Sequence, residues 1–156
     1  MIREIQLKDK EQWEKLYRGY ADFYKVEMNN KILQTVWSWL RDKNHEVDGL
    51  VYEIDGNIVG LAHYRRMPSP LRGQDIGFLD DLFVDPKYRG QKIGEKLINK
   101  MNEISKSKGW NLVRSGYAFA YRKYSDKFIK DEEFAKKNKL GMWALKFQYP
   151  WDFRKS

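Results

Sequence analysis

The chain has 156 residues, is 42% hydrophobic and 15% aromatic, and carries a formal net charge of +8. This is enough for one hydrophobic core, and neither a membrane-spanning apolar run nor a signal-peptide apolar region is present, so we expect a cytoplasmic protein without a membrane partner. With no cysteine and only two histidines, disulfides, thiolate metal sites and histidine-rich metal centres are excluded, and any chemistry must use carboxylates, phenols or backbone groups.

The first third of the chain predicts a strand followed by two helices. Residues 2–7 alternate between apolar and polar side chains, as a half-buried strand does. Asp9 then suits the N-cap of a helix that carries Trp13, Leu16 and Tyr17 on one side. A second helix is expected near residues 30–40.

A hairpin and a second acidic strand follow. Residues 47–54 and 58–66 are predicted strands, joined by Asp55-Gly56-Asn57, where glycine supplies the unusual backbone angle of a tight turn. Residues 72–77 follow two prolines and are predicted to be a loop. The next strand, residues 76–84, contains Asp80 and Asp81 and leads through Asp85-Pro86 to a glycine-bearing turn.

This turn opens an amphipathic helix that we expect over residues 90–106, where apolar residues recur at helical spacing. Such a turn directs several backbone N–H groups to one point, which favours phosphate binding. The Gly-Lys-Ser/Thr ending of a P-loop and the three spaced glycines of a dinucleotide fold are both absent. The alternative is an ordinary helix entry without a ligand.

The turn resembles the coenzyme A pyrophosphate loop of the GNAT N-acetyltransferases, whose pattern is Arg/Gln-x-x-Gly-x-Gly/Ala. Arg89 and Gly94 match it, and Lys92 stands where the middle glycine is usual. The resemblance covers about residues 2–113 and is closest to the diamine acetyltransferase branch. It implies an α/β fold, a GNAT-like mixed sheet with flanking helices, and acetyl-CoA as co-substrate. The cofactor-binding residues that it implies are Leu82, Phe83, Val84, Arg89, Gly90, Gln91, Lys92, Ile93 and Gly94.

The same resemblance implies catalytic residues. Acetyl transfer from a thioester to an amine needs a base for the amine, a hydrogen bond to the thioester oxygen and an acid for the departing sulfur. Asp80 stands where the diamine branch carries the glutamate that is proposed to act as base through water. Strand alternation places Asp81 on the opposite face, and we assign it, with Tyr24, to the substrate pocket. Tyr124 is the candidate acid.

Each of these residues also has a structural alternative. Asp80 or Asp81 could be paired with Arg65 or Arg66, and the tyrosines could be part of an aromatic core. We interpret His63 as a hydrogen-bonded residue of the sheet rather than as a base.

After Arg114 the sequence departs from the GNAT pattern. Residues 115–156 resemble the closing segment of staphylococcal-nuclease-like domains, but the barrel that carries the nuclease centre of that family is absent, so we expect no nuclease activity. We predict two parts, an acetyl-CoA-binding core over residues 1–114 and a basic aromatic segment over 115–156 that packs on the same domain. The alternative is a fused segment that docks loosely.

Three functions are considered. The first, which we favour, is an N-acetyltransferase that acts on a primary amine of a small amine, a polyamine or a lysine side chain. The second is a degenerate fold that binds coenzyme A without turnover. The third is a basic module that binds nucleic acid through the tail, since residues 114–156 hold 11 basic and 5 acidic side chains. No known nucleic-acid motif is present, so we do not expect that partner. The identity of the amine and a homodimer are left open.

Overall fold

The computed structural model describes residues 1–110 and Lys137. Contacts divide the chain into two units, Met1–Leu112 and Val113–Ser156, and all helices and strands below belong to the first. The elements are β1 (Ile2–Glu4), η1 (Leu7–Asp9), α1 (Lys10–Tyr24), α2 (Asn30–Arg41), β2 (Val47–Ile54), β3 (Asn57–Ser69), β4 (Gln74–Val84), η2 (Pro86–Tyr88) and α3 (Ile93–Ser107), where η marks a 3-10 turn.

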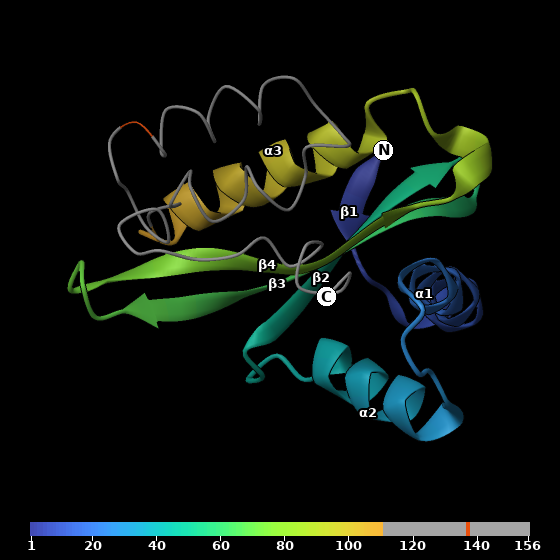
Figure 1. Cartoon of the computed structure of the whole chain (residues 1–156), viewed down its shortest axis with the longest axis horizontal. Coiled ribbons are helices and arrows are strands. Elements are labelled where there is room, and N and C mark those ends of the chain that lie inside the picture. The colour runs from blue at the N-terminus through green and yellow to red at the C-terminus, as the bar shows by residue number, and fades with distance from the viewer. Residues whose placement is uncertain (111–136, 138–156) are drawn as a thin grey trace. The chain divides into compact units, whose positions relative to one another are not determined.

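The described strands form one antiparallel sheet in the order β1-β2-β3-β4. Figure 1 shows α1 and α2 on one face of this sheet and α3 on the other. The expected α/β architecture with flanking helices is therefore confirmed.

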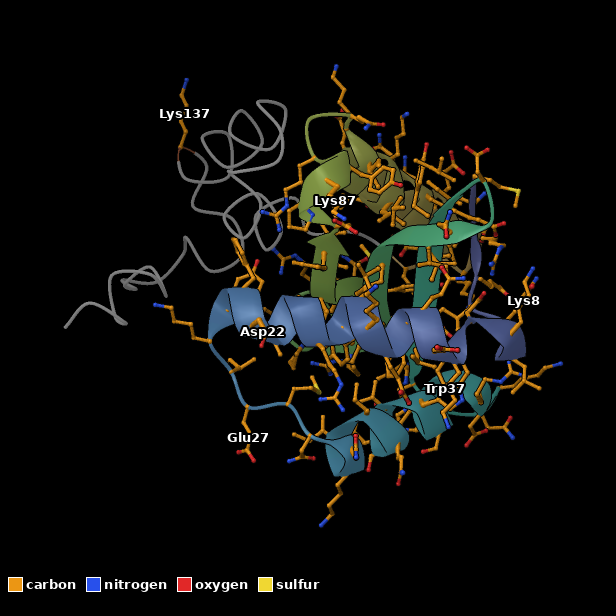
Figure 2. The ribbon with its side chains drawn as sticks, turned by 90° about the vertical axis from the view of Figure 1, so that its right-hand side faces the viewer. Lys8, Asp22, Glu27, Trp37, Lys87 and Lys137 are labelled. Carbon is orange, nitrogen blue, oxygen red and sulfur yellow. The ribbon has the colours of Figure 1, made fainter. Side chains whose placement is uncertain are left out.

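The core on the first face is built around tryptophan rings. Trp13 of α1 has no exposed surface, and its ring lies 5.2 Å from the ring of Trp37 in α2. The two helices lie side by side on this face (Figure 2). Burial of large apolar side chains at helical spacing, which stabilises by roughly 1.5–3 kcal/mol for each side chain, holds the helices on the sheet.

On the opposite face, α3 approaches the sheet at a glycine. A Cβ atom at Gly60 of β3 would lie 3.1 Å from Ile93 and 3.2 Å from Leu97. The missing side chain therefore lets the first turns of α3 lie close to the sheet. The first turn of α3 is therefore held against β3, the neighbour of β4 in the sheet.

Several predicted boundaries are corrected by the structure. The first strand ends at Glu4, because Leu7–Asp9 forms a 3-10 turn. The predicted loop over residues 72–77 is shorter, because β4 begins at Gln74 and pairs with an extended β3. The last helix begins at Ile93, because Gly90 and Lys92 have φ of 84° and 60°. Left-handed residues interrupt a right-handed helix.

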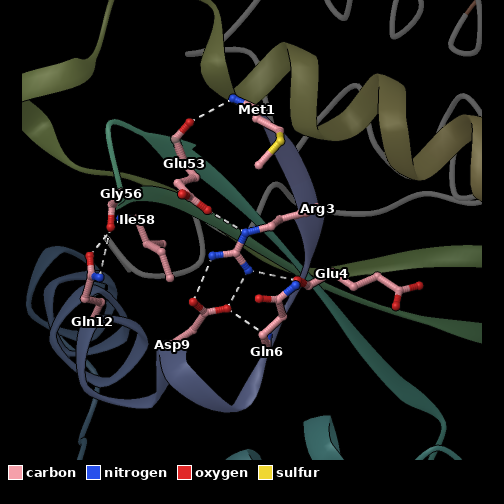
Figure 3. Close-up of polar contacts among 9 residues, drawn as sticks. All are labelled: Met1, Arg3, Glu4, Gln6, Asp9, Gln12, Glu53, Gly56 and Ile58. Carbon is pink, nitrogen blue, oxygen red and sulfur yellow. Dashed lines mark hydrogen bonds and ion pairs between the residues drawn. The ribbon is translucent and has the colours of Figure 1, made fainter.

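Asp9 stands at the predicted N-cap position of α1, but its side chain does not cap the helix. Instead, the Arg3 guanidinium donates to both Asp9 carboxylate oxygens at 2.6 and 2.9 Å. The Gln6 N–H donates to the same carboxylate (Figure 3). Asp9 thus ties β1 to the start of α1.

Candidate active site

A β-bulge in β4 lies at the centre of the candidate site. His63 of β3 pairs with Asp81, but the next residue, Tyr64, pairs with Leu79. Asp80 is therefore the extra residue of the bulge. A bulge bends the strand and redirects a side chain, so the simple alternation of faces fails at this point.

The bulge places both carboxylates on the face covered by α1. His63 and Arg65 are two residues apart on β3 and share a face. Asp81 lies 2.8 Å from the His63 Nδ1, and Asp80 accepts from the Arg65 Nε at 3.1 Å. The prediction that Asp80 and Asp81 face opposite sides of the sheet is therefore wrong.

The environments of the two carboxylates differ. Burial raises the pKa of Asp80, the neighbouring Asp81 charge adds to this rise, and Arg65 partly offsets it. Burial also opposes ionisation of Asp81, but hydrogen bonds from His63, Tyr20 and Tyr17 outweigh it and hold the Asp81 pKa below its usual value. A pair of acidic groups with divergent pKa shifts is a pattern of acid and base sites.

The aromatic side chains beside Asp81 come from α1. The Tyr17 hydroxyl donates to Asp81 Oδ2 at 2.9 Å. Burial and the Asp81 charge raise the pKa of Tyr17 and Tyr20, so both phenols stay protonated as donors. The Tyr20 ring lies 5.5 Å from Tyr17 and 4.7 Å from Tyr24. Tyr24 therefore extends a row of rings that begins beside Asp81.

His63 has both ring nitrogens engaged. Nδ1 lies 2.8 Å from Asp81 Oδ2, and Nε2 accepts from the indole N–H of Trp13 at 3.0 Å. The side chain is 1% exposed. His63 is therefore a hydrogen-bonded residue of the sheet, as its sequence position suggested, and it has no nitrogen left for a substrate proton.

The loop before α3 offers a row of backbone donors. No backbone N–H group of residues 90–95 donates to an acceptor in the part of the chain that the structure describes. These groups lie at the N-terminus of a 15-residue helix, where the helix dipole favours an anion. Lys92 occupies the N-cap with φ of 60°, which explains why glycine is the usual residue there: a side chain in this conformation costs roughly 1–2 kcal/mol.

Arg89 lies against the end of β4 and the aromatic row. Its Nε donates to the Val84 carbonyl at 3.1 Å. Its guanidinium carbon lies 4.8 Å from the centre of the Phe23 ring and 5.4 Å from that of Phe83. Arg89 thus links the loop to the face that carries the carboxylates.

Not all of the β4 backbone groups that we expected to contact the cofactor point away from β3. The Asp85 N–H donates to the Val59 carbonyl at 2.8 Å. Because bonded pairs alternate along an antiparallel ladder, the Phe83 backbone is directed at β3, whereas the Leu82 and Val84 backbones point to the other edge. Of the three residues expected to offer backbone groups to a cofactor, only Leu82 and Val84 have the required direction.

Some predicted residues lie outside the described part of the chain. The candidate acid Tyr124 is one of them, and so is the whole segment 115–156. Conversely, the network that fixes Asp81 includes Trp13 and Tyr17, which helical spacing alone marks only as core residues. This network becomes visible only when β3 and β4 are paired in the sheet and α1 is packed on them.

Two negative findings concern residues 1–110 and Lys137. Within them, no group of three or more histidine, aspartate or glutamate side chains is arranged to hold a metal ion. None of the helices seen there has the length and apolar character needed to cross a bilayer.

Known proteins with similar sequences are N-acetyltransferases. The D-amino-acid N-acetyltransferase of Saccharomyces cerevisiae is 28% identical over 100 residues, which cover 63% of this chain and 62% of that protein. The thialysine N-epsilon-acetyltransferase of Bos taurus is 40% identical over 57 residues, which cover 36% of this chain and 33% of that protein. The chain thus matches less than two thirds of the length of either relative.

A solved structure supports the fold. The crystal structure of a protein from Clostridium acetobutylicum, described as a predicted acetyltransferase with acetyl-CoA, superimposes with a TM-score of 0.60 at 15% identity, over 72% of this chain and 77% of that one. The sequence profile described as the acetyltransferase (GNAT) family matches residues 11–130, which extends past residue 113, where we expected the resemblance to end. Because this match covers more than half of the sequence, the chain belongs to the GNAT family of acetyltransferases.

Proposed function

We propose that the protein is an acetyl-CoA-dependent N-acetyltransferase that acts on a primary amine, either of a small molecule or of a lysine side chain. One observation carries this proposal: the bulge in β4 places Asp80 and Asp81, with opposite pKa shifts, on the same face of the sheet. Membership of the GNAT family supports the reaction class.

The cofactor would lie along β4 and on the loop that precedes α3. The N–H groups of residues 90–95, which donate to no acceptor among the described residues, suit the pyrophosphate, with Arg89, Gly90, Gln91, Lys92, Ile93 and Gly94 forming the cradle. The outward backbone groups of Leu82 and Val84 suit the amides of the pantetheine arm. Lys92 is exposed and adds positive charge beside the phosphates.

Replacing Gly94 with valine is expected to weaken acetyl-CoA binding at least about tenfold, or about 1.4 kcal/mol. Gly94 lies in the first turn of α3, where a branched side chain would obstruct the approach of the pyrophosphate to the backbone. Titration calorimetry with the folded variant measures the effect. Asn102→Val, a matched change further along α3, is the control and should leave the affinity for acetyl-CoA unaltered. Equal affinities for wild type, the Gly94 variant and Asn102→Val would contradict the assignment of the loop.

Asp80 is proposed as the base. The neutral amine attacks the thioester carbonyl and forms the new N–C bond, and its proton passes to Asp80 directly or through water. The C–S bond then breaks, and the thiolate of coenzyme A takes a proton from an acid. A raised pKa makes Asp80 a better proton acceptor near neutral pH than an ordinary carboxylate. Tyr124 stays our proposal for the acid.

Asp81, Tyr20 and Tyr24 are proposed to form the amine pocket. A lowered pKa keeps Asp81 ionised, and an ionised carboxylate beside tyrosine rings attracts a cationic group. The names of the relatives agree with an amine acceptor, since one is named for D-amino acids and the other for the epsilon nitrogen of thialysine.

Removing Arg65 is expected to move the acid limb of the pH profile. Arg65 lowers the pKa of Asp80 through a hydrogen bond and its charge. Its loss therefore raises this pKa further, and the acid limb of kcat/KM, which reports the base of the free enzyme, shifts to higher pH in Arg65→Gln. Arg66→Gln is the control, because Arg66 is paired with Asp75. If the acid limbs of wild type, Arg65→Gln and Arg66→Gln lie at the same pH, Asp80 does not govern the pH profile.

Binding and turnover assays separate the proposed function from its alternatives. Calorimetry with acetyl-CoA followed by thiol release with a panel of primary amines should show both binding and turnover. Binding without release from any amine would favour a degenerate coenzyme A-binding fold. Absence of binding would favour a basic binding module.

A further inference from the structure

Two buried side chains that take no part in the proposed chemistry form a chain of hydrogen bonds that ends on Asp81. Trp13 comes from α1 and His63 from β3, and they are 0% and 1% exposed. The indole N–H lies 3.0 Å from His63 Nε2, and His63 Nδ1 lies 2.8 Å from Asp81 Oδ2. Asp81 is the member nearest to solvent, with 17% of its side chain exposed.

The indole determines the direction of these two hydrogen bonds. An indole nitrogen is always a donor and never an acceptor. His63 Nε2 must therefore be the acceptor, so the hydrogen of a neutral imidazole lies on Nδ1 and is donated to Asp81. A proton on Nε2 would place two N–H groups against each other at 3.0 Å.

We infer that Trp13 is a positioning residue whose indole N–H holds His63 as the neutral Nδ1–H tautomer, which orients the Asp81 carboxylate and leaves its negative charge uncancelled. The inference rests on the proposed function only for what this charge attracts, namely the cationic group of the substrate. Trp13 would act through His63 and touch neither substrate nor cofactor.

The other groups around His63 leave this role to the indole. Tyr17 faces His63 from α1, with ring centres 4.8 Å apart, and its phenol donates to Asp81 rather than to His63. Asp80 and Asp81 face His63 from β4, and Arg65 on β3 is paired with Asp80. On β2, the residue opposite His63 is Gly49, which has no ionisable group. The indole N–H is therefore the contact that opposes a proton on Nε2.

Nitrogen NMR of the full-length protein tests the tautomer without any assay of activity. We expect the wild-type His63 signals to show a protonated Nδ1 and an unprotonated Nε2, because Nε2 accepts from the indole. The only other histidine is His45, so a His45→Gln variant assigns the signals. In Trp13→Phe, which keeps an aromatic ring but lacks the N–H, the His63 Nε2 signal should move, because Nε2 loses its donor.

Steady-state kinetics test the consequence for Asp81. In Trp13→Phe, His63 is no longer held in one tautomer and Asp81 loses its fixed donor, so KM for a cationic amine should rise about tenfold, with kcat and acetyl-CoA affinity close to wild type. Trp37→Phe is the control, because it removes an indole from the same aromatic cluster without contacting His63. Adding His63→Asn to Trp13→Phe should bring KM back towards wild type, because an amide N–H can donate to Asp81 without help from the indole.

Protonation of wild-type His63 at Nε2, or the same KM in wild type and Trp13→Phe, would overturn the inference. The wild-type spectra decide the tautomer even if Trp13→Phe fails to fold, which circular dichroism reveals. If no amine is acetylated, the proposed function fails while the NMR result stands. The two failures are therefore distinguishable.

Discussion

Replacing Asp80 with asparagine is expected to lower kcat about 100-fold, while the affinity for acetyl-CoA stays close to wild type. Asparagine has nearly the same shape as aspartate and can still meet Arg65, but it cannot accept the proton of the attacking amine. Asp80 lies on the face opposite to α3 and is paired with Arg65, so binding should be spared. Saturating kinetics measure kcat, and calorimetry measures the affinity.

Asp75→Asn provides the control for this experiment. Asp75 lies on the same strand and also pairs with an arginine, Arg66, at 2.8 Å, but it is more exposed. The control should retain wild-type kcat. If Asp80→Asn also stays within a factor of about 2, positioning of the amine with solvent as base suffices, and Asp80 is not the base.

Replacing Arg3 with methionine is expected to lower the free energy of unfolding by about 3 kcal/mol at neutral pH. Asp9 is only 2% exposed, and Arg3 donates to both of its carboxylate oxygens. Without the guanidinium, a buried carboxylate would be left with the Gln6 N–H alone. Urea denaturation of both proteins measures the difference.

The effect of Arg3→Met should depend on pH. Burial opposes ionisation of Asp9, but hydrogen bonds from Arg3 and Gln6 outweigh it and lower the Asp9 pKa. The stabilisation is therefore present above the unfolded pKa of about 4 and is lost as pH falls through the lower folded value. The two proteins should converge in stability in acid.

Arg18→Met is the control for Arg3→Met, because Arg18 donates to Asn30 at an exposed position. Its loss should cost less than about 1 kcal/mol. A similar loss in both variants, independent of pH, would show that the buried ion pair does not stabilise the fold.

The features predicted correctly from sequence are those that local chemistry determines. The bounds of β2 agree with the prediction, because its strand pattern ends at a turn in which Asp55 and Gly56 both have positive φ. The loop before α3 was found because a strand, a glycine-bearing turn and an amphipathic helix follow one another directly.

The features missed from sequence depend on contacts between distant segments. The bulge at Asp80 exists only as a register shift between β3 and β4, so strict alternation gave the wrong face for one carboxylate. In the same way, Asp9 stands at the predicted N-cap position, but its side chain accepts from Arg3 rather than from the helix, and a partner on the neighbouring strand is not visible in a local pattern. Both misses concern carboxylates whose partners lie on another element.

The most direct test of the account is mass spectrometry of the products that the wild-type protein forms from acetyl-CoA and a panel of primary amines. We predict an acetylated amine together with an equimolar amount of free coenzyme A, and loss of both products in Asp80→Asn. Protein that binds acetyl-CoA in calorimetry but acetylates no amine of the panel, or that acetylates equally well without Asp80, would contradict the account.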